Sequence, residues 1–179
     1  MRRPPLTMVN MTAAADAPIV FKSFMLGFYT AEVQRVLPRT CFVLVNRDPV
    51  DNALSILNMR RQFSRDENSW TGVKPLAYPQ YADSAPVVQA TAQAWLVEAA
   101  YRRALAKIRP DHTLILSYES VCEQPEAALE SIESMMTGAG GRMVRTSHEL
   151  PNLKARHAND SDERRAVQRA LQDIQRNHP

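Results

Sequence analysis

One continuous run of apolar residues, from Cys41 to Val45, constrains the fold of this chain more than any other segment. Prolines at positions 38 and 49 bracket the run, and its length is typical of a strand that is buried on both faces. The sequence then changes to helical spacing over residues 51–63. A buried strand that leads into a helix indicates an α/β fold, with a mostly parallel sheet flanked by helices.

The rest of the chain alternates between strand and helix signals in the same way. With 179 residues and ordinary apolar and charged content, it suits a single domain over residues 1–179. Weak strand signals occur at residues 6–11 and 142–145. Clearer strands are expected over residues 18–21, ending at Lys22, and over residues 113–118. Helices are expected at residues 25–37, 87–108, 123–136 and, after an acidic start at 160–163, over 166–174.

Residues 64–86 are the longest segment without strand or helix spacing. They contain Gly72 and three prolines, together with Trp70, Tyr78 and Tyr81. Irregular segments of this length are uncommon in compact domains and are often functional. We expect either a lid or acceptor pocket lined by the aromatic residues, or a packed loop cluster.

The composition of the chain indicates which ligands and which cellular location to expect. The net charge is +3, and no dense basic run with interleaved aromatic residues is present, so we expect no nucleic-acid partner. No apolar stretch is long enough to cross a bilayer, so we expect no membrane span. The two cysteines and four histidines show no metal-ligand spacing, so we expect no metal. A reducing, cytoplasmic compartment fits the cysteine content.

Three polar positions follow the predicted strands directly. Lys22, Arg47 and the pair Tyr118–Glu119 each lie at or just after a strand end. Ligands of parallel α/β sheets bind beyond the carboxyl ends of the strands, so these side chains are expected to converge at one edge. Ser55 follows Arg47 by eight residues, and an arginine fork with a serine hydroxyl can hold a phosphate.

Each of these residues also has a simpler interpretation. Arg47 could pair with Asp48 or Asp51 at the strand end, and Ser55 could be a packing serine in a helix. Lys22 could be a solvated strand-end lysine, and Tyr118 a half-buried tyrosine. The four histidines fit loop or surface positions better than catalysis.

Taken together, three segments resemble the sulfotransferase family. The first is Phe42–Ser55, in which a strand is followed by Arg-Asp-Pro-x-Asp and then by a serine eight residues after the arginine. The second is Lys22-Ser23, at the end of the predicted strand that precedes this segment. The third is the strand, Tyr-Glu and helix pattern of Leu114–Val121 with Gln124-Pro125. The resemblance covers residues 18–137 and implies a P-loop NTPase-like α/β fold.

The resemblance also implies a reaction and a set of roles. The sulfuryl donor would be PAPS, whose spent form is PAP, and the acceptor a hydroxyl or amine of a small molecule or glycan. Arg47 and Ser55 would bind the donor's 3′-phosphate, and Tyr118 would lie beside its adenine. Lys22 would be the catalytic residue that stabilises charge near the transferring group. No metal is implied.

The sequence departs from the family pattern in two places. No glycine-rich loop for the 5′-phosphosulfate precedes Lys22, and Phe24 stands where many members have a catalytic histidine. The implied fold is therefore truncated at its N-terminal side. Either residues 6–11 substitute for the missing strand, or a partner chain or second copy supplies it, or the sequence is a fragment or a degenerate copy.

Two other functions stay open from the sequence. The missing loop favours a non-catalytic remnant that binds 3′-phosphonucleotides or is purely structural. A P-loop kinase relative is the weakest alternative, because no G-x-x-x-x-G-K-[ST] motif occurs.

Overall fold

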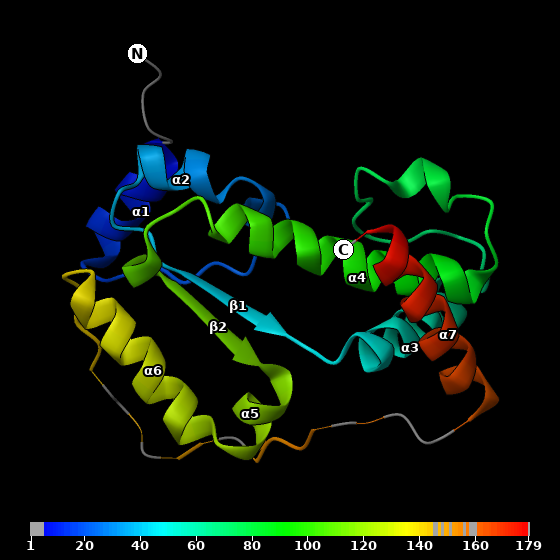
Figure 1. Ribbon diagram of the computed structural model, residues 1–179. Coiled ribbons are helices and arrows are strands. Elements are labelled where there is room, and N and C mark those ends of the chain that lie inside the picture. Colours follow the sequence, from blue (N-terminus) through cyan, green and yellow to red (C-terminus); the bar gives the residue numbers. More distant parts are fainter. Residues whose placement is uncertain are drawn as a thin grey trace.

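The computed structural model describes residues 6–144, 147, 149, 150, 152–155, 157 and 161–178 (Figure 1). Short 3-10 turns and a π-helical turn at residues 60–64 connect the main elements. The elements are α1 (Leu6–Ala15), α2 (Thr30–Val36), β1 (Phe42–Asn46), α3 (Pro49–Met59), α4 (Pro86–Leu105), β2 (Thr113–Ser117), α5 (Tyr118–Glu123), α6 (Pro125–Gly138) and α7 (Asp162–Asn177).

The sheet is parallel, as the sequence predicts. β1 pairs with β2 in a register that runs from Phe42 opposite Thr113 to Asn46 opposite Ser117. α4 packs against β1 and α6 against β2, so helices flank the two strands (Figure 1). Both strands end at the same level, and the residues that follow them therefore lie side by side.

Within the described residues the sheet has two strands, and the strand predicted at residues 18–21 is wrong. This segment is irregular, Pro18 has no N–H to donate to a ladder, and the side chain of Val20 is almost fully exposed. Apolar residues of the paired strands are also incompletely covered, with Val43 41% and Val45 49% exposed. The expectation that the main strands are buried on both faces is therefore wrong for these two positions.

The weak strand signal at residues 6–11 is wrong as well. These residues open helix α1, which continues through Ala13, Ala14 and Ala15, and alanine is the strongest helix former. This segment therefore does not substitute for the missing strand. Residues 142–144 are irregular rather than a strand, and Arg145 lies outside the described residues.

Helix starts follow the local capping chemistry. Asp48 caps α3 by accepting a hydrogen bond from the backbone N–H of Asp51 at 2.9 Å, and Pro49 occupies the first turn. Ser161 caps α7 in the same way, which confirms the predicted helix start except for Asp160, outside the described residues. Ser117 ends β2 and caps α5, a short helix that was not predicted and that begins at Tyr118, the residue expected to end the strand. The helix predicted over residues 123–136 is α6, which begins at Pro125.

The hydrophobic core lies between α3, α4 and α7. One cluster joins α3 and α4 to Val167 and Leu171 of α7, and a second cluster joins α4 and Tyr81 to Ile174 of α7. Figure 1 shows α7 lying against α3 and α4, although β2, α5 and α6 separate it from α4 in the sequence. The final amphipathic helix is therefore an integral part of the core. None of the described helices is both long and apolar enough to cross a membrane.

A buried arginine fixes the irregular segment to α4. Arg60 is fully buried and donates to the carbonyl of Glu67 at 3.1 Å, to Gln89 Oε1 at 3.0 Å and to Gln93 Oε1 at 3.1 Å. Burial lowers the pKa of its guanidinium from the usual value. The two glutamines donate in turn to the carbonyls of Ala82 and Thr71. Residues 64–86 are thus irregular, as predicted, and held by side-chain hydrogen bonds.

Replacing Arg60 with Met should lower the free energy of unfolding by about 3 kcal/mol, because the buried amide oxygens of Gln89 and Gln93 lose a charged donor. Urea denaturation followed by circular dichroism measures this change. Arg103→Met, at an exposed position of α4, is the matched control and should change the value by less than about 0.5 kcal/mol. Equal midpoints for the two variants would contradict a stabilising role for this network.

Candidate functional site

Two of the predicted site residues meet at the carboxyl edge of the sheet. Arg47 directly follows β1 and Tyr118 directly follows β2, and the strand register places them level with each other. The guanidinium carbon of Arg47 lies 4.8 Å from the centroid of the Tyr118 ring. A cation at this distance from an aromatic ring is attracted by the ring's π-electrons. Arg47 is therefore held at the strand end with an aromatic surface beside it.

Helix α3 begins at this edge and carries the third residue. Ser55 is exposed and lies one turn after Asp51, so both are on the same side of α3. Arg47 precedes the helix by two residues. The dipole of a helix start favours anions near it. An arginine, an exposed serine and a helix N-terminus together make an arrangement that suits a phosphate group.

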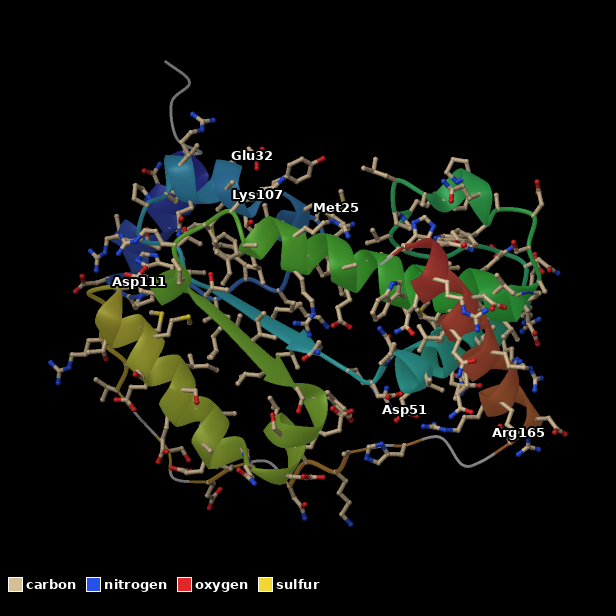
Figure 2. All side chains as sticks on the ribbon, in the orientation of Figure 1. Met25, Glu32, Asp51, Lys107, Asp111 and Arg165 are labelled. Carbon is tan, nitrogen blue, oxygen red and sulfur yellow. The ribbon has the colours of Figure 1, made fainter. Side chains whose placement is uncertain are left out.

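Asp51 lies at the start of α3 (Figure 2) and is the centre of an ion cluster. Its side chain is 1% exposed, and its two carboxylate oxygens lie 2.6 Å from Arg164 Nη1 and 2.9 Å from His157 Nδ1. Arg164 belongs to the first turn of α7, and His157 to the segment that precedes it. Both hydrogen bonds therefore join Asp51 to the C-terminal part of the chain.

Glu119 lies next to this cluster. Its Oε1 atom is buried and accepts no hydrogen bond from the described residues. One donor atom each from Asp51, Glu119 and His157 lie within 4.8 Å of one another. Arg164 and His157 already occupy the two oxygens of Asp51, and a divalent cation would be repelled by the arginine, so we assign no metal to this cluster. The absence of a metal stays a prediction.

Lys22 lies apart from the other predicted site residues. No strand delivers it to the edge, since it belongs to the irregular segment before α2, and its side chain is exposed. Its Nζ atom lies 5.6 Å from the ring centroid of Phe24, and no described hydrogen bond or ion pair joins it to Arg47 or Tyr118. The expectation that three strand ends converge is therefore correct for two and wrong for Lys22.

An open pocket of about 580 Å³ adjoins the cluster, because His157 lines it. The hydroxyl of Tyr118 approaches the carbonyl of Lys154 at 3.5 Å, which brings the segment before α7 over the edge of the sheet. The walls of the pocket come from α5, from the start of α6 and from the segment before α7. They are formed by Cys122, Glu123, Pro125, Asn152, Leu153, Lys154, Ala155 and His157.

Sequence reasoning missed the ion cluster. It treated Asp51 only as a partner for Arg47 and placed His157 in a loop or on the surface, whereas His157 is 56% exposed and yet bound to a buried carboxylate. The sequence did not suggest any role for Arg164. The amphipathic pattern of the last helix was the available signal, because it required α7 to pack against α3 and so to bring its first turn near Asp51.

Comparison with known proteins yields a family match. The family model described as "Sulfotransferase family" matches residues 7–137, which is well over half of the chain. No curated protein and no solved structure matches the chain. The match contains β1, β2 and the residues between them, and it ends before α7.

Removing the partner of Asp51 should destabilise the fold. Arg164→Met removes a charged partner of the buried Asp51 carboxylate, and should lower the free energy of unfolding by about 2 kcal/mol, a value reduced from that of fully buried pairs because Arg164 is partly exposed. Thermal and urea unfolding measure it. Arg176→Met, which removes an exposed pair with Asp173 on the same helix, should have almost no effect. A loss no larger than that of the control would contradict the cluster's importance.

Proposed function

The chain belongs to the sulfotransferase family, and we propose that it transfers a sulfuryl group from PAPS to a hydroxyl or amine of a small-molecule or glycan acceptor. One observation carries the donor assignment. Arg47 and Tyr118, which follow two different strands and are far apart in the sequence, stack against each other at the edge where α3 begins. A charged fork, an aromatic ring and a helix start in one place are what a phosphorylated nucleoside requires.

Each residue at this edge has a distinct role in the proposed donor site. The planar guanidinium of Arg47 donates parallel N–H bonds to the 3′-phosphate, and the hydroxyl of Ser55 donates a further one. The Tyr118 ring provides an apolar surface for the adenine and also keeps Arg47 in place. Because guanidinium and ring already touch in the free protein, little side-chain ordering is needed when the nucleotide binds.

The transfer itself depends on positioning and charge. The bond between sulfur and the bridging oxygen of the donor breaks as the acceptor oxygen or nitrogen bonds to sulfur, and the acceptor's proton leaves to a base. Negative charge develops on the departing phosphate, where an ammonium group stabilises it. We assign this role to Lys22, whose exposed position on an irregular segment leaves its side chain free to approach the bound donor.

The position of Lys22, away from the edge of the sheet, favours a second candidate function, the binding of 3′-phosphonucleotides without catalysis. A protein that binds 3′-phosphonucleotides without catalysis needs the edge formed by Arg47, Ser55 and Tyr118 but needs no lysine there. Lys22 is not joined to that edge by any described contact, and the chain has no glycine before Gly27. Binding and transfer therefore have to be measured separately.

Calorimetric titration with PAP tests the donor site. We expect saturable binding by the wild type and a loss of about 10- to 100-fold in affinity for Arg47→Ala, because a charged hydrogen bond to phosphate contributes about 1.5–3 kcal/mol. Arg103→Ala, which removes an exposed arginine of α4, should bind like the wild type. Unchanged affinity in Arg47→Ala would refute the assignment, and absence of binding by folded wild-type protein would refute the donor site altogether.

Transfer of labelled sulfuryl from PAPS to a panel of acceptors tests catalysis. Lys22→Ala should lower kcat by about 100-fold while leaving the Kd for PAP within about threefold, since the lysine acts on charge that develops only during transfer. Lys107→Ala, at an exposed position just after the end of α4 (Figure 2), is the control. PAP binding without any transfer would establish the non-catalytic alternative instead.

A further inference from the structure

Helix α4 contacts both parts of the proposed site, the end of β1 and the segment that carries Lys22. Glu98 of α4 accepts a hydrogen bond at 3.3 Å from the side chain of Asn46, the last residue of β1. Three residues after Glu98, the hydroxyl of Tyr101 donates a hydrogen bond at 2.8 Å to the backbone carbonyl of Phe24. Residues three apart lie on the same side of a helix. One side of α4 therefore joins the strand end to the segment of Lys22.

Tyr101 holds this segment through its ring as well as through its hydroxyl. The centroid of the ring lies 4.6 Å from that of Phe28. Gly27 approaches the same ring so closely that a Cβ atom added there would lie 2.7 Å from Tyr101 Cε1, a distance that real Cβ atoms essentially never show. A side chain at this position would displace either the ring or the segment. Burial raises the pKa of the Tyr101 hydroxyl, so the hydroxyl keeps its proton and can donate near neutral pH.

The anchored backbone begins close to Lys22. Phe24 follows Lys22 by two residues, and among the described residues no hydrogen bond from another element lies nearer to Lys22 in the sequence than the one from Tyr101. Farther along, Thr30 is 1% exposed and donates a hydrogen bond to the carbonyl of Ala104 at 2.8 Å, so α4 also fixes the start of α2. The side chain of Lys22 is exposed. A long and free lysine side chain thus stands beside a backbone that is tied to α4.

We propose that Tyr101 is a positioning residue for sulfuryl transfer, which holds the segment of Lys22 at a fixed place relative to the carboxyl edge of the sheet. The proposal rests on the roles given above to Arg47 and Lys22. Because transfer requires the ammonium group and the bound donor in one geometry, a displacement of about 1 Å can slow it strongly. Binding of the donor needs no such help, since Arg47 and Ser55 hold its phosphate. Tyr101 acts through Lys22 and is not a catalytic residue.

Tyr101→Phe removes the hydroxyl and keeps the ring. We expect kcat for transfer from PAPS to fall about three- to tenfold, as the loss of one hydrogen bond predicts, with the Kd for PAP within about twofold of the wild type. In the Lys22→Ala background the same substitution should change kcat by less than about 1.5-fold, because the residue through which it acts is absent. Tyr29→Phe is the matched control. It removes an exposed tyrosine hydroxyl that makes no hydrogen bond to the described residues, and should leave kcat unchanged.

Gly27→Ala tests the same contact from the side of the segment, and it serves if thermal unfolding shows that Tyr101→Phe is not folded. Its methyl group displaces the ring, so kcat should fall about tenfold while the Kd for PAP stays within about twofold. An unchanged kcat in the folded variants overturns the positioning role, as does an equal loss for Tyr101→Phe with and without Lys22; the proposed reaction stands in both cases. Absence of transfer by folded wild type overturns the reaction and the positioning role together.

Discussion

The pairing of a buried carboxylate with an arginine and a histidine joins the distant parts of this protein. Asp51 lies in the first turn of α3, where the helix dipole favours a negative charge, and its position in the interior makes uncompensated burial costly. Arg164 and His157 satisfy it, and in doing so they hold the start of α7 against the carboxyl edge of the sheet. The pair between Arg61 and Glu163 fixes the same turn of α7 to the end of α3. The apolar stripe of α7 provides the contact area, and these ion pairs fix its position.

The sequence was most informative where one short segment determines its own structure. The apolar run before Arg47 and the Asp-Pro start of α3 produce a strand, a turn and a capped helix through interactions between near neighbours in the chain. The same holds for β2 and the residues that follow it. Arg47 and Tyr118 could therefore be placed at one edge from the sequence, because parallel strands in register must end together.

Two parts of the site could not be predicted, because they depend on contacts between distant segments. The strand signal before Lys22 was very short, and a strand forms only where a neighbour accepts its hydrogen bonds; this segment has no such neighbour among the described strands. The ion cluster depends on how α7 packs against α3, and no local sequence pattern predicts that packing. The family resemblance could not supply it either, since the match ends at residue 137 and α7 begins at Asp162.

The place of α7 in the core has a consequence for how the protein is made. Val167, Leu171 and Ile174 complete both apolar clusters that α3 and α4 begin. During synthesis the ribosome releases α3 and α4 long before α7, so their apolar faces stay uncovered until α7 has been translated. Contacts of such large sequence separation slow folding and leave a nascent chain open to aggregation. We infer that α3 and α4 complete their packing only after α7 has been synthesised.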